Sequence, residues 1–190
     1  LNAAQGNLAI PLLRWHTLRM NTNSGAQPPL KESNRPLADL PPLPSLCRAG
    51  ALRPVPSEAA CLALWDKYGM LPNIRRHSLL VAHVAATLAQ RAADRGFAVH
   101  VPEVRAGGLL HDIAKTYCVK HGGSHAQVGA AWTVAETGNY AIAQGVMMHV
   151  WWPWALPQGP EICSLPFFVI YADKRIRHDA CVTLEERYED

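Results

Sequence analysis

The sequence predicts an all-α fold, a compact helical bundle, on three observations. From residue 57 onward, apolar residues recur at the three-to-four-residue spacing of a helix that buries one face. Almost no segment alternates polar and apolar residues with the two-residue period of a half-buried strand. Residues that favour helix starts, and glycines that can end helices, separate the apolar stretches. The composition, 49% hydrophobic and 17% charged in 190 residues, is typical of a folded globular protein.

Three helices are expected in the first part of this bundle. Ser57 can accept a hydrogen bond from the free amides at the start of the first helix. The second helix is expected to begin after an Asn73 cap and to end at Gly96. Pro102 suits the first turn of the third helix, where its missing amide hydrogen loses no bond. This third helix is expected to carry the His-Asp doublet at residues 111–112.

Four more helices are expected in the second part. Three of them are predicted over residues 126–137, 140–149 and 165–177. Ser124 can cap the first of these three, and Gly138 can end it. Thr183 and Glu186 have the spacing of a capping box, in which side chain and backbone exchange two hydrogen bonds. They predict a seventh helix near the C-terminus.

Residues 1–55 differ in composition from the rest of the chain. The segment 21–56 contains eight prolines, which remove amide donors and favour extended backbone. We therefore expect residues 1–55 to form a Pro-rich N-terminal arm or linker and residues 56–190 to form the folded domain. Because the chain begins at Leu1 and stops inside a predicted helix, we also expect it to be a fragment or a trimmed form of a longer protein.

Charge and composition narrow the classes of partner. A formal net charge of +3 is too small to indicate nucleic-acid binding and is compatible with a small anionic substrate. The best apolar run, residues 141–156, is interrupted by polar residues and a proline, so no membrane span is expected. The five cysteines are odd in number, and no two have C-x-x-C spacing. They indicate reduced thiols in a cytoplasmic protein.

Six side chains that can bind a transition metal lie in five separate apolar segments. They are His77, His111, Asp112, His125, His149 and Asp173. Burying imidazoles and carboxylates is costly unless they pair with each other or hold an ion. Histidine and carboxylate donors together suit a divalent transition metal such as iron, manganese, cobalt or nickel. We therefore predict a metal site assembled from several helices.

Taken singly, most of these residues also have an ordinary interpretation. A histidine on an apolar helix stripe, such as His77, is often a hydrogen-bonded core residue. His125 lies where a helix is expected to start and could be a capping residue, whereas His149 lies at a helix end, where the dipole favours a positive charge. Asp173 could pair with a lysine or arginine that follows it. The metal site is the preferred interpretation because it accounts for all six residues together.

The order of these ligands resembles that of a known family. Helical His77, then Leu-Leu-His-Asp-Ile-Ala-Lys over residues 109–115, then Asp173, resembles the H…HD…D pattern of the HD superfamily of metal-dependent phosphohydrolases. The additional His125 and His149 resemble the two-metal branch of that superfamily. This branch includes bacterial enzymes that split diadenosine tetraphosphate symmetrically.

The resemblance covers residues 56–190 and implies an HD-domain helical bundle that binds one or two divalent ions. One ion would be held by the four residues of the H…HD…D pattern. A second ion would be held by Asp112, His125 and His149, with Asp112 bridging the two. A metal-activated hydroxide would then cleave a phosphoester or phosphoanhydride bond of a nucleotide or dinucleotide.

Three further residues have expected roles at such a site. Lys115 follows His111 by one helical turn and is expected to neutralise phosphate charge in the transition state, so we assign it a catalytic role together with Asp112. Arg177 is a weaker phosphate-binding candidate. Trp152 could stack on a nucleobase, although covering the core or forming a dimer contact is the preferred interpretation of the tryptophans in this segment.

Two other functions stay open from the sequence. A non-catalytic HD-type regulatory or binding module would keep the helical bundle without the chemistry. A di-iron oxygenase with a similar ligand set is the weaker alternative. The leading hypothesis is an enzyme that acts on a small phosphorylated substrate, a nucleotide, with no membrane or nucleic-acid partner. A homodimer is compatible with the sequence.

Overall fold

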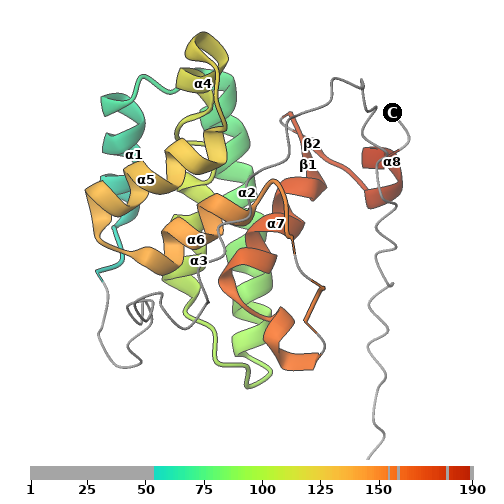
Figure 1. The fold of residues 1–190 in the computed structure, drawn as a ribbon. Helices are drawn as coiled ribbons and strands as arrows, with labels where there is room; N and C mark the ends of the chain where they lie inside the picture. Colours follow the sequence, from blue (N-terminus) through green and yellow to red (C-terminus); the bar gives the residue numbers. More distant parts are fainter. Residues whose placement is uncertain (1–53, 154, 158, 179, 189–190) are drawn as a thin grey trace, which may run out of the picture. The chain divides into compact units, whose positions relative to one another are not determined.

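The computed structural model is mainly helical (Figure 1), which confirms the predicted all-α class. It describes residues 54–153, 155–157, 159–178 and 180–188. All but the last two residues of the predicted N-terminal arm lie outside these ranges, and so does Trp154. The division of the chain at residue 55 therefore stays a prediction.

The first two helices begin close to the predicted positions. α1 (Glu58–Lys67) starts where the Ser57 hydroxyl accepts a hydrogen bond from the Ala60 amide, as predicted. α2 (Pro72–Ala93) starts one residue before Asn73, and no side chain caps it. The expectation of an asparagine cap is wrong here, because Pro72, whose ring suits the first helical position, begins the helix and places Asn73 inside its first turn.

The His-Asp doublet lies between two helices and not within one. α3 (Val101–Leu110) ends directly before the doublet, and α4 (Lys115–His121) begins three residues after Asp112. Hydrogen bonds between residues three apart turn the chain over residues 110–115. The expectation that the third helix carries the doublet is therefore wrong. α4 is not predicted, because its seven residues show no clear apolar stripe.

The next two helices agree closely with their predicted bounds. α5 (His125–Thr137) begins at Ser124, whose hydroxyl accepts a hydrogen bond from an amide of the first turn. It ends at Gly138, which adopts the left-handed backbone conformation that glycine tolerates best. α6 (Tyr140–Met148) is followed by His149, which lies at its C-cap position.

The C-terminal elements include a small hairpin that is not predicted. They are η2 (Gly159–Ile162), α7 (Leu165–Arg175), β1 (Ile176–Arg177), β2 (Ala180–Cys181) and α8 (Leu184–Tyr188). β1 and β2 pair antiparallel, so α7 ends two residues earlier than expected. Strands of two residues are too short to show alternation in the sequence. Thr183 and Glu186 exchange both predicted capping-box hydrogen bonds at the start of α8.

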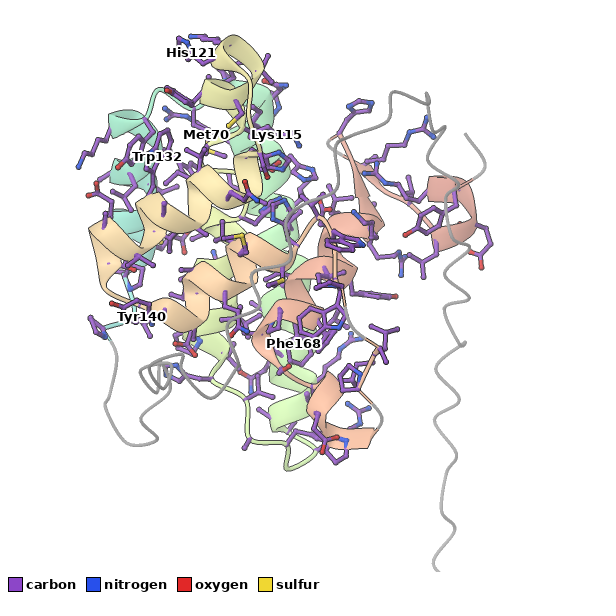
Figure 2. All side chains as sticks on the ribbon, in the orientation of Figure 1. Met70, Lys115, His121, Trp132, Tyr140 and Phe168 are labelled. Carbon is purple, nitrogen blue, oxygen red and sulfur yellow. The ribbon has the colours of Figure 1, made fainter. Side chains whose placement is uncertain are left out.

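The bundle is organised around α2, which packs along α3 and α7, while α5 packs on α6 and α6 on α7. α2 and α3 approach each other most closely at Gly108, where an added Cβ would lie 2.6 Å from the Cα atom of Ala82. This contact brings the chain that follows α3 close to α2. Figure 2 shows Phe168 among the interior side chains of the bundle and His121 at the far end of α4.

The sequence predicts reduced cysteines and no membrane-spanning helix. Four cysteines lie in the described part of the chain and all are free thiols: Cys61, Cys118, Cys163 and Cys181. Cys47 lies outside the described residues. Among the described helices, none combines the length and the apolar character that crossing a bilayer requires.

Candidate metal centre

Six side chains from five parts of the bundle converge on one small volume. They are His77 of α2, His111 and Asp112 of the turn after α3, His125 of α5, His149 after α6 and Asp173 of α7. The structure therefore brings together every predicted ligand. The doublet lies deepest, since His111 and Asp112 are 0% and 1% exposed.

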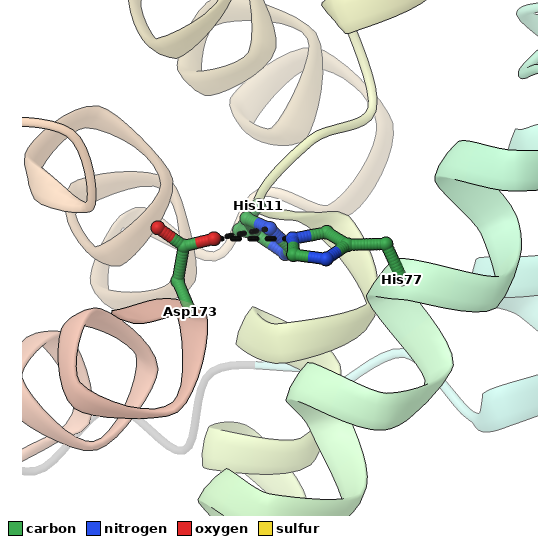
Figure 3. Close-up of side chains that lie close together, drawn as sticks. All are labelled: His77, His111 and Asp173. Atoms are coloured by element: carbon green, nitrogen blue, oxygen red, sulfur yellow. Dashed lines mark hydrogen bonds and ion pairs between the residues drawn. The ribbon is translucent and has the colours of Figure 1, made fainter. Parts of the chain in front are cut away.

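The first group of ligand atoms lies between α2 and α7 (Figure 3). The Nε2 atoms of His77 and His111 lie 3.1 Å and 3.7 Å from Asp173 Oδ1. The same two nitrogens lie 3.9 Å and 3.5 Å from Oδ2 of Asp112. Ligand atoms of His77, His111 and Asp173 all lie within 4.8 Å of one another. This spacing suits a single ion between them.

The second group of ligand atoms lies around Oδ1, the other carboxylate oxygen of Asp112. This oxygen lies 3.3 Å from His125 Nε2 and 3.6 Å from His149 Nε2. Those two nitrogens are 3.2 Å apart. The two oxygens of one buried carboxylate thus face two different groups of imidazoles, an arrangement suited to a carboxylate shared by two ions.

Main-chain carbonyls orient two of the imidazoles. His111 Nδ1 lies 2.7 Å from the Gly108 carbonyl oxygen, and His149 Nδ1 lies 2.7 Å from that of Val146. A carbonyl oxygen can only accept, so each Nδ1 carries the hydrogen and donates it. In the neutral ring, Nε2 then has its lone pair free and faces the centre. This is the tautomer that binds a metal through Nε2.

Two buried polar atoms at the centre lack a hydrogen-bond partner among the described residues. They are His111 Nε2 and Asp112 Oδ1. Leaving a buried acceptor unpaired costs about 1–3 kcal/mol, and here both atoms are acceptors that face the same volume. A bound cation would satisfy both of them. The donor set therefore fits the divalent transition metal that the sequence implies.

Burial and neighbouring charges set the protonation states of these groups. Burial lowers the pKa of His111 to about 4 and also lowers the pKa of His125, so both rings are neutral near pH 7. Burial alone would raise the pKa of Asp112 and Asp173. The surrounding imidazoles and the neighbouring lysines outweigh it and hold the pKa of both carboxyl groups well below the usual value.

The pKa of His111 predicts that acid destabilises the metal-free protein. Between pH 4 and pH 6.5 the unfolded chain binds a proton at His111 that the folded protein does not bind, so the free energy of unfolding falls as the pH falls. We expect a loss of roughly 2 kcal/mol between pH 7 and pH 5. Both carboxylates stay ionised in this window and add a loss only below about pH 4.

Urea unfolding at pH 7 and pH 5 in the presence of a chelator measures this loss. His111→Gln, which cannot take up the proton, should show a flatter pH dependence, and the exposed His83→Gln should keep the original one. A free energy of unfolding that is unchanged or higher at pH 5 would contradict the assignment.

A pocket of about 490 Å³ opens onto the two groups of ligands. Lys115 lines it, and its Nζ atom lies 2.7 Å from Asp112 Oδ2. Figure 2 shows Lys115 beside the start of α4. Neither Arg177 nor Trp152 is among the lining residues. The Trp152 ring packs against Phe167 of α7, with ring centroids 4.6 Å apart, so the proposed roles of Arg177 and Trp152 in substrate binding stay predictions.

The pocket is also lined by basic residues that were not predicted from the sequence as site residues. Arg76, Lys174, His178 and Arg187 all line it. Lys174 also forms an ion pair with Asp173, at 3.0 Å, which is the ordinary interpretation that the sequence left open for this aspartate. Arg76 precedes His77 and could have been suspected from that position. No local pattern indicates Arg187, because only the hairpin and α8 bring it to the pocket.

The loop of the hairpin also contacts the centre. The His77 Nδ1 atom lies 3.3 Å from the backbone oxygen of His178, which has a positive φ of 59°. His77 thus has an acceptor oxygen beside each ring nitrogen, Asp173 at Nε2 and His178 at Nδ1. A proton or a cation is required on the Nε2 side, because nitrogen and carboxylate lone pairs repel each other at this distance.

Comparison with known proteins gives one family and one distant relative. A family model described as "HD domain" matches residues 74–176, a range that contains all six candidate ligands. An uncharacterized protein of Methanocaldococcus jannaschii is 43% identical over 58 residues, which are 30% of this chain and 33% of the relative. The match thus spans about a third of that protein's length. Comparison with solved structures gives no match.

Proposed function

This chain belongs to the HD-domain family, and on that premise we propose that it is a metal-dependent phosphohydrolase. Its substrate would be a nucleotide or dinucleotide, cleaved at a phosphoester or phosphoanhydride bond. The observation that carries the proposal is the position of Asp112, whose two oxygens face His77 and His111 on one side and His125 and His149 on the other. The diadenosine tetraphosphate branch is a narrower proposal that rests on the sequence resemblance alone.

The six ligands would hold one or two ions of iron, manganese, cobalt or nickel. A bound ion would supply a Lewis acid for a phosphate oxygen and a water of lowered pKa. The chain's own contribution is to hold the imidazoles and the ionised carboxylates in place. Burial of His111 and Asp112 keeps bulk water from the base of the pocket, so electrostatic interactions there are weakly screened.

Lys115 would act on the substrate. Its ammonium group ion-pairs with Asp112, yet 42% of its side chain is exposed in the pocket wall. The group can therefore remain near Asp112 while donating a hydrogen bond to a phosphate oxygen that enters from the mouth. Negative charge grows on that oxygen as the bond breaks, so the ammonium would stabilise the transition state more than the ground state.

Metal analysis and a substrate panel test the proposal. The purified protein should contain a divalent transition metal that a chelator removes. With Mn²⁺ restored, it should hydrolyse at least one of a panel of nucleoside mono-, di- and triphosphates, dinucleoside polyphosphates and a generic phosphodiester. Metal content without turnover of any phosphorylated compound would favour the regulatory module. An oxygen-dependent spectral change of the iron-loaded protein would favour the oxygenase.

A further inference from the structure

We infer that the pocket contains a second anion subsite, formed by Arg76 and Arg187, which binds a phosphate group linked to the one that is cleaved. The inference rests on the proposed function and narrows it, because it assigns the substrate to compounds with at least two linked phosphates. Neither residue is one of the six candidate ligands. Arg76 precedes His77 on α2, and Arg187 lies on α8.

The two arginines differ from the two lysines in the same pocket. Lys115 and Lys174 each form an ion pair with a candidate metal ligand, Asp112 and Asp173 respectively. The side chains of the arginines make no hydrogen bond or ion pair with any described residue. Their charge is therefore available to a ligand.

The pocket has an excess of positive charge before any metal binds. Two carboxylates and four lysine or arginine side chains line it. The two lysines balance the two carboxylates, so the arginines are left over, and bound ions would add further positive charge. A single phosphate held by the ions and Lys115 leaves this excess uncompensated, whereas a second linked phosphate would offset it. Guanidinium groups suit phosphate because they can donate two parallel hydrogen bonds.

The start of α2 adds further groups that attract an anion to the same pocket. Asn73 and Ile74, in the first turn of this helix, line the pocket. Amides at these positions have no acceptor within the helix, and the first turn carries neither an acidic residue nor a side-chain cap. The free amides and the helix dipole therefore favour an anion near Arg76.

The hairpin holds Arg187 near the metal centre. The backbone oxygen of His178, in the hairpin loop, accepts from His77 Nδ1 at 3.3 Å. The capping-box bonds of Thr183 then fix the start of α8, which carries Arg187. Residues 177–188 lie beyond the segment that matches the family model. Arg187 therefore lies outside the segment that the family model matches, whereas Arg76 lies within it.

Binding of adenosine diphosphate and adenosine monophosphate tests the subsite. Calorimetric titrations would use the full chain with Mn²⁺ at a fixed free concentration, so that chelation by the nucleotides does not alter metal occupancy. We expect the diphosphate to bind at least tenfold more tightly. Arg76→Gln and Arg187→Gln should each weaken diphosphate binding about tenfold, with little change for the monophosphate. Arg91→Gln, on the same helix about 22 Å away, is the matched control.

A parallel turnover assay with the full panel of phosphorylated compounds separates this inference from the proposed function. Turnover of any member of the panel, together with a diphosphate preference that the arginine variants leave unchanged, would overturn the subsite and leave the phosphohydrolase. An arginine-dependent preference without any turnover would support the subsite and reject the phosphohydrolase. Equal binding of the two nucleotides without turnover would reject both.

Discussion

Asp112→Asn is expected to abolish turnover and to remove most of the bound metal. Asparagine has the same shape but no charge, and its amide nitrogen would replace one of the two oxygens that face the imidazoles. An NH₂ group repels a cation, so one group of ligands loses its oxygen donor. We expect a loss of kcat of roughly 10³-fold or more. Metal content per chain and the initial rate measure the two effects.

Two variants show whether the effect of Asp112→Asn is specific. Asp94→Asn changes an exposed aspartate that only accepts a hydrogen bond from Gln90, and it should retain metal and rate. Lys115→Gln should retain metal but lower kcat, because this lysine is not a ligand. Retention of full metal content and rate by Asp112→Asn would rule out the metal mechanism.

Gly108→Ala is expected to destabilise the fold and to weaken metal binding together. The new Cβ would lie 2.6 Å from Ala82 Cα and 2.9 Å from its amide nitrogen. Both are backbone atoms, so α2 and α3 must move apart. We expect a loss of about 1–3 kcal/mol in the free energy of unfolding. The same movement would carry His77 away from His111, so metal affinity should also fall.

The neighbouring glycine provides the control for this variant. A Cβ at Gly107 would meet side-chain atoms of Leu165 and Val169 at 3.4 Å, an ordinary contact. Gly107→Ala should therefore stay within about 1 kcal/mol of the original stability, helped by the higher helix propensity of alanine. Urea unfolding and metal titration of both variants give the comparison. Equal stability and affinity of the two would contradict the close helix contact.

Local chemistry made much of the fold predictable. Ser57 and Ser124 cap helices where their hydroxyls were expected to, and the Thr183–Glu186 capping box forms. These capping interactions join residues that are three or four positions apart, so both partners can be recognised in the local sequence. The same holds for Gly138, because the left-handed conformation is a property of one residue. The candidate ligands were recognisable because their order along the chain resembles a family pattern.

Features that depend on distant contacts were not predictable. The doublet lies in a turn, not in a helix, because the chain must bend there to pass from α3 to α4. The two-residue strands exist only through their pairing. Arg187 lines the same pocket as Arg76, which lies more than 100 residues earlier in the chain, because the hairpin reverses the chain direction after α7. No spacing within the sequence encodes these three arrangements.

His111 and His149 each follow a helix and donate Nδ1–H to the carbonyl three residues earlier, one of the carbonyls that a helix end leaves unpaired. Each of these hydrogen bonds therefore pairs a carbonyl at a helix end and also orients a candidate metal ligand. Replacing either imidazole would therefore remove a candidate ligand and also leave a helix-end carbonyl without its partner. We expect metal affinity and the free energy of unfolding to fall together at these two positions.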